Sequence, residues 1–293
     1  MSLGHEHHHH KLNKLSRLRM AIFLTAAGML IEFVGGYLSN SLALISDAWH
    51  MLTHLLALGM SYFAIILALR PVSKTHTYGF FRAEVLAAFI NAIVLVFITG
   101  YLVYESMVKI VHPEIIKVHE MFFIAIFGLL INGVSILLLV KANANDLNIR
   151  SAILHELGDT FSSVAVVIGA VSIIYTKNYI IDPILSLFIC LLIVIWAVKL
   201  FVESSQILLE ATPKHLDIDE LSKAVKLEVP GILDINHVHA WTITTSMYAL
   251  TAHVVIEDCH VSKANEILVK INHLLWKRFN IEHTNIQFEC RVK

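Results

Sequence analysis

The sequence carries little charge and few cysteines for its length. Of its 293 residues, 15% are charged and 57% are hydrophobic, whereas soluble domains carry about 25% charged residues. The net charge is −1 and the basic residues form no block, so nucleic-acid binding has no support. The three cysteines are scattered and form no C-x-x-C pair, which argues against a disulfide framework. This is the composition of a protein that crosses a lipid bilayer several times.

The first ten residues, MSLGHEHHHH, are rich in histidine. A native tail of this kind can collect metal ions, and the remnant of an added tag is the alternative. Both interpretations stay open. No cleavage site follows the first apolar stretch, so we expect no cleaved signal peptide.

Six apolar segments are long enough to cross a bilayer, which takes about 20 residues each. They cover residues 18–38, 42–69, 83–108, 121–140, 152–175 and 179–202. An even number of spans places both termini on one side, and the lysines and arginines favour the cytoplasm. We therefore predict an integral protein of the inner or plasma membrane. A tail over residues 1–16 precedes a six-helix transmembrane domain over residues 17–208.

A smaller domain is predicted over residues 209–293, where the long apolar runs end. Amphipathic helices are expected at residues 217–229 and 261–279, and strands at 235–243, 248–257 and 284–290. The order α-β-β-α-β predicts an α+β domain whose helices cover one face of a small sheet. Exposed apolar surface on so small a domain would favour a homodimer.

Two pairs of metal-binding side chains lie inside apolar segments: His50 with His54, and His155 with Asp159. Ionisable groups are costly in hydrocarbon and mark a functional site there. A spacing of four residues puts both members of a pair on one face of a helix. Two such pairs on two helices can offer four ligands to one ion.

The ligand types favour a transition metal. Three imidazoles and one carboxylate suit the tetrahedral coordination of Zn²⁺, whereas Mg²⁺ and Ca²⁺ prefer oxygen ligands. Co²⁺ and Cd²⁺ stay open as further ions. Histidine titrates near physiological pH and binds metal only when neutral, so protons and metal compete for such a site. That competition is a chemical basis for exchanging outgoing metal for incoming protons.

The same residues also allow functions other than transport. The pairs could be structural polar contacts, or could hold a permanent structural metal. His155 and Glu156 begin a sequence similar to the H-E-x-x-H motif of metalloproteases, but the fifth residue is Asp159. A metal sensor without transport is a further alternative. No G-x-x-x-x-G-K-[ST] loop is present, so ATP is not indicated as an energy source.

Two acidic residues in the apolar segments have open roles. Asp47 precedes His50 by three residues. It could orient an imidazole from behind the metal ligands, or satisfy backbone groups near a helix end. Glu32 lies in the first span. It could form buried hydrogen bonds between helices, or take part in the passage of protons or metal.

Four motifs allow comparison with a known family. They are SLALISDAWHMLTH (residues 41–54), YGFFRAE (78–84), NIRSAILHELGD (148–159) and HTNIQFE (283–289). These segments resemble the zinc-transporting branch of the cation diffusion facilitator family, and the resemblance extends over nearly the whole chain. It implies a homodimeric six-helix exporter of divalent metal, driven by proton antiport and alternating access. It also implies a cytoplasmic ferredoxin-like, metallochaperone-like domain and no enzymatic activity.

The chain departs from that branch at His54. The branch usually has H-x-x-x-D in both helices, and here His54 stands at the usual position of Asp. The site therefore has one negative charge fewer and is richer in nitrogen, which should further disfavour hard cations.

The resemblance implies a second, cytoplasmic zinc site with a role in regulation. Its ligands would be His239, His253 and Glu289, with Cys290 or His283 nearby as a fourth. His237 and His239 alternate along a predicted strand and so share a face.

Overall fold

The computed structural model describes the backbone of residues 20, 23–68, 74–75, 79–143, 147–244 and 247–290. The side chains of the same residues are described except for residues 54, 57–68, 141–143, 147–152, 154 and 155. The chain divides into two compact units. One comprises Met1–Gly59 with Asn91–Lys199, and the other comprises Met60–Ile90 with Leu200–Lys293.

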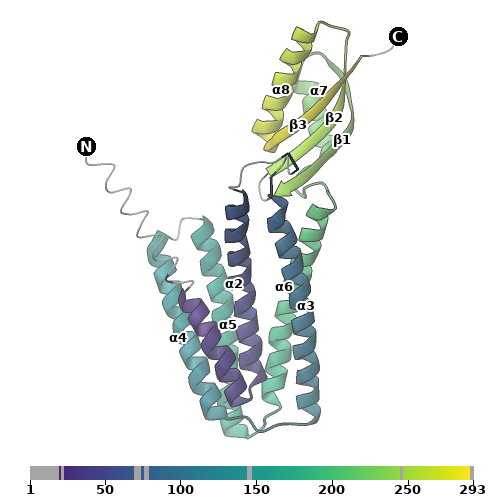
Figure 1. Ribbon diagram of the computed structural model, residues 1–293. Helices are drawn as coiled ribbons and strands as arrows, with labels where there is room; N and C mark the ends of the chain where they lie inside the picture. The colour runs from purple at the N-terminus through teal and green to yellow at the C-terminus, as the bar shows by residue number, and fades with distance from the viewer. Residues whose placement is uncertain are drawn as a thin grey trace, which may run out of the picture. The chain divides into compact units, whose positions relative to one another are not determined.

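Long helices form wherever the sequence is apolar over 17 residues or more (Figure 1). They are a first helix at Phe23–Ser39, α2 (Leu42–Ala68), α3 (Arg82–Val111), α4 (Val118–Asn143), α5 (Leu147–Thr176) and α6 (Ile181–Leu208). Within the described residues, four stretches are long and apolar enough to cross a membrane: Arg82–Val111, Val118–Val140, Glu156–Thr176 and Ile181–Leu208. The expectation of helices at these positions is confirmed.

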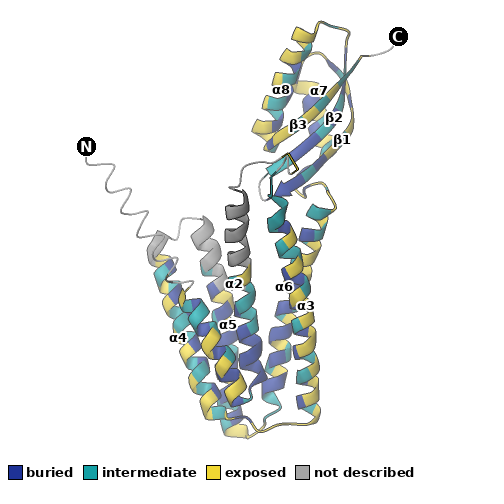
Figure 2. Ribbon diagram, in the orientation of Figure 1, coloured by how far each residue is buried: buried dark blue, intermediate teal, exposed yellow. Residues whose placement is uncertain are grey.

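The helices are apolar on their outer as well as their inner faces. Leu44, Met121, Ile173 and Ile189 are fully buried in one cluster that α2, α4, α5 and α6 share. Exposed residues, yellow in Figure 2, also run along these helices. Many of them are large and apolar; Phe123 of α4, for example, is 68% exposed. A helix that is hydrophobic all round is typical of a membrane span, because the outer side chains then contact lipid.

The C-terminal residues fold into the predicted α-β-β-α-β order. The elements are α7 (Ile218–Glu228), β1 (Ile232–Thr244), β2 (Met247–Ile256), α8 (Val261–Phe279) and β3 (Ile281–Cys290). In the sheet β2 lies between an antiparallel β1 and a parallel β3. β1 and β3 begin three residues earlier than predicted, because Gly231 (φ +95°) and Asn280 (φ +56°) turn the chain directly into each strand.

Both helices of this domain cover the same face of the sheet. Leu221 of α7, Ile271 of α8 and Val254 of β2 belong to one buried cluster. Successive side chains of a strand point to opposite faces, so residues such as His253 lie on the face that the helices leave uncovered. That face carries the histidines discussed below.

Candidate metal site in the helix bundle

His50 of α2 and Asp159 of α5 face each other inside the helical unit. His50 Nε2 lies 3.3 Å from Asp159 Oδ1, and Asp159 is only 2% exposed. The two residues belong to different predicted pairs. The structure therefore brings one member of each pair together across two helices.

The side chains of the other two predicted ligands, His54 and His155, lie outside those that the structure describes. Their backbones belong to α2 and α5, one turn away from His50 and Asp159. Residues four apart share a helix face, so α2 and α5 are suitably placed to contribute both pairs. The complete set of four ligands stays a prediction.

Asp47 connects α2 to α5 through hydroxyl groups. Ser162 Oγ donates to Asp47 Oδ1 at 2.5 Å, and Ser163 Oγ donates to Asp47 Oδ2 at 3.0 Å. Ser163 also accepts a hydrogen bond from Asn132 Nδ2 of α4 at 3.2 Å. Among the hydrogen bonds of the described residues, both partners of Asp47 are serine hydroxyls rather than an imidazole or a backbone group, the two kinds of partner considered from the sequence. The carboxylate instead holds α5 against α2, one turn from His50.

Two further carboxylates lie between the first helix and its neighbours. Glu156 Oε1 accepts a hydrogen bond from Thr25 Oγ1 at 2.7 Å, which joins α5 to the first helix. Glu32 is fully buried, and neither of its carboxylate oxygens has a hydrogen-bond partner among the described residues. Of the two roles left open for Glu32, hydrogen bonding between helices therefore finds no contact in support among the described residues.

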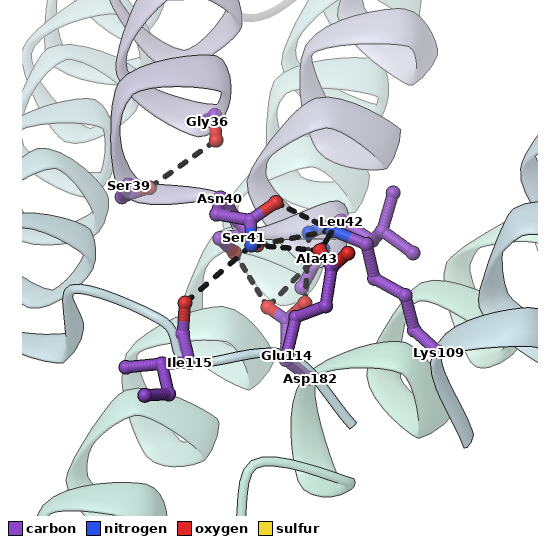
Figure 3. Close-up of polar contacts among 10 residues, drawn as sticks. All are labelled: Gly36, Ser39, Asn40, Ser41, Leu42, Ala43, Lys109, Glu114, Ile115 and Asp182. Atoms are coloured by element: carbon purple, nitrogen blue, oxygen red, sulfur yellow. Dashed lines mark hydrogen bonds and ion pairs between the residues drawn. The ribbon is translucent and has the colours of Figure 1, made fainter. Parts of the chain in front are cut away.

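The N-terminus of α2 is held by a carboxylate from α6 (Figure 3). Asp182 Oδ1 accepts a hydrogen bond from Ser41 Oγ at 2.5 Å, and Asp182 Oδ2 accepts one from Leu42 N at 2.7 Å. A longer contact of 3.3 Å reaches Ala43 N. The first amides of a helix have no partner within the helix, and the helix dipole favours an anion there. Asp182 meets both requirements.

A second polar group lies beside this helix end and is also drawn in Figure 3. Lys109 Nζ lies 2.6 Å from Asn40 Oδ1 and 3.1 Å from Glu114 Oε2. Asn40 Nδ2 donates to the same Glu114 oxygen at 2.9 Å. Hydrogen bonds from Asn40 and Lys109 hold the pKa of the Glu114 carboxyl, in the loop between α3 and α4, below its ordinary value. These contacts connect the turn that precedes α2 with the C-terminal end of α3.

In the C-terminal domain the structure joins two of the three predicted cytoplasmic ligands. His253 Nδ1 lies 2.7 Å from Glu289 Oε1. The ring next to His253 is that of His237, with 5.0 Å between ring centroids. His239 pairs with Thr251 further along the sheet. His237 rather than His239 lies beside His253 because β1 is irregular between Asn236 and His239. There His237 adopts φ +48° and turns toward β2.

Strand geometry keeps both residues considered as a fourth ligand away from His253 and Glu289. Cys290 follows Glu289 directly on β3 and so points to the opposite face of the sheet. His283 lies six residues from Glu289 on the same strand, which corresponds to about 20 Å. Among the side chains that the structure describes, no three His, Cys, Asp or Glu residues lie close enough together to hold a metal ion.

Some contacts of the site were not predicted from the sequence. Ser162 and Ser163 follow Asp159 by three and four residues, and that spacing on a helix could have placed them beside the metal ligands. Asp182 gives a weaker signal, because an acidic residue before Pro183 only indicates a helix start. Nothing in the sequence near residue 182 points to the N-terminus of α2.

Comparison with known proteins agrees with the motifs. A family model described as the cation efflux transmembrane domain matches residues 18–209, and the cation efflux protein cytoplasmic domain matches residues 213–290. The chain belongs to the cation efflux, or cation diffusion facilitator, family. It therefore combines a membrane-embedded transmembrane domain with a cytoplasmic α+β domain. The family is one of transporters, which agrees with the expectation that the chain is not an enzyme.

Several curated relatives match almost the whole chain. The zinc transporter ZitB of Pectobacterium atrosepticum is 38% identical over 289 residues, 98% of this chain and 89% of its own length. The metal cation efflux system protein CzcD of Cupriavidus metallidurans is 37% identical, over 99% of this chain and 90% of its own. A cadmium, cobalt and zinc/H(+)-K(+) antiporter of Bacillus velezensis is 33% identical, over 98% and 92%.

Proposed function

We propose that this protein exports divalent transition metals from the cytoplasm, with Zn²⁺ as the main substrate, in exchange for protons. The relatives are named for zinc, cadmium and cobalt, and one of them is named an antiporter. Under this proposal, the first helix and α2 complete a set of six spans with both termini in the cytoplasm.

The meeting of His50 and Asp159 is the observation that carries this proposal. An imidazole and a carboxylate from two helices lie 3.3 Å apart in a buried place. Burying ionisable groups is costly unless they have a partner. A divalent ion between them supplies such a partner, and His54 and His155 would complete a tetrahedron from the same two helices.

Proton exchange follows from the chemistry of the same residues. An imidazole binds metal through a neutral nitrogen and loses that capacity when protonated. Protonation on the outer side of the membrane would therefore release the metal, and metal binding on the cytoplasmic side would release protons. Alternating access of the site to the two sides would couple the two flows.

The cytoplasmic domain would act as a dimerisation and regulatory domain. His253, Glu289 and the neighbouring His237 have the nitrogen and oxygen ligands that suit Zn²⁺, and His239 lies on the same face of the sheet. A metal bound here would hold β1, β2 and β3 together on their uncovered face. The matching face of a second copy could supply the remaining ligands and so link metal binding to the homodimer.

Transport in vesicles tests the proposal. The purified protein is reconstituted in lipid vesicles, and Zn²⁺, Co²⁺, Cd²⁺ or Mn²⁺ flux is measured with an imposed pH gradient. Asp159→Asn and His155→Ala should lower Zn²⁺ flux at least about tenfold, which corresponds to a loss of about 1.4 kcal/mol. Glu120→Gln, which alters an exposed carboxylate at the start of α4, is the control and should transport normally. Metal binding with no flux of any ion would favour a sensor instead.

The replacement at His54 has its own test. His54→Asp restores the pattern of the zinc branch and adds a negative charge, so it should change either the order of metal preference or the pH profile of flux. If both stay the same, His54 does not contact the metal and the proposed set of four ligands is incorrect.

A further inference from the structure

Glu32 occupies an unusual environment in the first helix. Its side chain is 0% exposed, and both carboxylate oxygens lack a hydrogen-bond partner among the described residues. The carboxyl group fits against α4 where Gly128 has no side chain. A Cβ added at Gly128 would lie 1.8 Å from Glu32 Oε1, so this notch in α4 is filled by the glutamate.

An ionised carboxylate has little support at this place. Burying an unpaired charge costs several kcal/mol even after the protein relaxes, and none of the described side chains donates a hydrogen bond to Glu32 that would offset that cost. The carboxylate of Asp47 on α2 acts on Glu32 electrostatically and would repel a further negative charge. Asp47 differs, since two serine hydroxyls donate to it. Of these buried acids, Glu32 is therefore the one best suited to be neutral, with a proton bound.

The surroundings give no support to Glu32 as a metal ligand. Among the described side chains, no group of three His, Cys, Asp or Glu residues lies close enough to hold an ion. Four ligands are the usual number for Zn²⁺. The feature that singles out Glu32 is therefore its own environment, a fully buried carboxyl group with no hydrogen-bond partner among the described residues.

We propose that Glu32 carries one proton per transport cycle, in addition to the protons exchanged at the metal ligands. In the outward-facing conformation its carboxylate takes a proton from water, and in the inward-facing conformation the acid returns that proton to water on the cytoplasmic side. The O–H bond forms and breaks with water as the only other reactant. This inference rests on the proposed antiport. It assigns one coupled proton to a residue that does not bind the metal.

The test measures protons and metal in the same vesicles. The full-length protein is reconstituted with the membrane potential held at zero, and Zn²⁺ flux and internal pH are followed together. Glu32→Gln keeps the size and shape of the side chain but cannot release a proton. It should bind Zn²⁺ with unchanged affinity and move about one proton fewer per ion. The steady-state Zn²⁺ gradient at one pH unit should then fall about tenfold, since each coupled proton contributes about 1.4 kcal/mol per pH unit.

The outcomes separate this inference from the proposed function. If the wild type moves no Zn²⁺, the exporter proposal fails and this inference fails with it. If the wild type is proton-coupled and Glu32→Gln shows the same proton-to-metal ratio and the same gradient, only the role of Glu32 is overturned. Should Glu32→Gln not fold, Glu32→Ala and Glu32→Asp give the same comparison. Coupling by the extra proton should be lost in the alanine variant and kept in the aspartate variant, and equal ratios in the two would overturn the inference.

Discussion

Removing the carboxylate of Asp182 should loosen the N-terminal turn of α2. The side chain accepts hydrogen bonds at 2.5 Å from Ser41 Oγ and 2.7 Å from Leu42 N, with a longer contact to Ala43 N. Asp182 and Ser41 are both fully buried, so the donors cannot turn to water when the acceptor is lost. The alanine variant therefore leaves a hydroxyl and at least one amide unsatisfied in the membrane.

The magnitude follows from these contacts. A hydrogen bond to a charged group contributes about 1.5–3 kcal/mol, and an anion at a helix N-terminus adds about 0.3–1 kcal/mol. Counting the two short bonds and the helix end, Asp182→Ala should destabilise this helix end by about 3–7 kcal/mol. Asp182→Asn keeps one acceptor oxygen without the charge and should cost about 1–2 kcal/mol.

Hydrogen exchange of the backbone amides provides the assay, because it reports local opening. A loss of 3 kcal/mol corresponds to a factor of about 100 or more, so the amides of Leu42 and Ala43 should exchange at least about 100-fold faster in Asp182→Ala. The matched control is Glu120→Ala, which removes an acidic residue from the first turn of α4. Its side chain is 52% exposed and lies 3.6 Å from Lys117, so the effect should stay below about 1 kcal/mol. Unchanged exchange at Leu42 in the Asp182 variant would refute this reasoning.

Three further changes have expected outcomes. The pKa of the Glu114 carboxyl is lowered in the folded protein, so the ionised carboxylate stabilises the fold. This contribution should be complete above about pH 4.3 and be lost as the pH falls through the lower pKa of the folded state. Acid unfolding of the wild type and of Glu114→Gln, compared side by side, measures the contribution. His237→Ala should weaken Zn²⁺ binding by the cytoplasmic domain whereas His283→Ala should not, in titrations of the full-length protein with a zinc indicator, and equal effects would contradict the strand geometry. Gly128→Ala should displace Glu32 and lower the proton-to-metal ratio. Gly133→Ala changes a second glycine of α4, where an added Cβ meets no described atom within 4 Å, and should leave the ratio unchanged.

The C-terminal domain could be predicted closely because its periodicity is local. α8 begins and ends at the predicted residues, since apolar positions such as Ile267, Ile271 and Leu275 repeat at helical spacing and form its buried face. The strand starts were less accurate. Gly231 and Asn280 determine where β1 and β3 begin through backbone angles that hydrophobic alternation does not report.

The metal site could be predicted in part. The spacing of four placed His50 and His54 on one helix face, and the structure shows that α2 turns His50 toward Asp159. The serine partners of Asp47 could not be predicted, nor could the lack of a hydrogen-bond partner for Glu32 among the described side chains. Both depend on how the helices are rotated about their axes, and an apolar segment that is hydrophobic all round gives no signal for that rotation.

The sequence by itself determined the membrane helices, the α+β domain and the residue types of the candidate metal site, because length, periodicity and spacing are properties of one segment. Only the tertiary structure decided which segments meet. It brought Asp182 to the N-terminus of α2, some 140 residues earlier in the chain, and it placed His237 rather than His239 beside His253. Such contacts arise from packing between elements, where one helix rotation or one strand irregularity decides which side chains face each other.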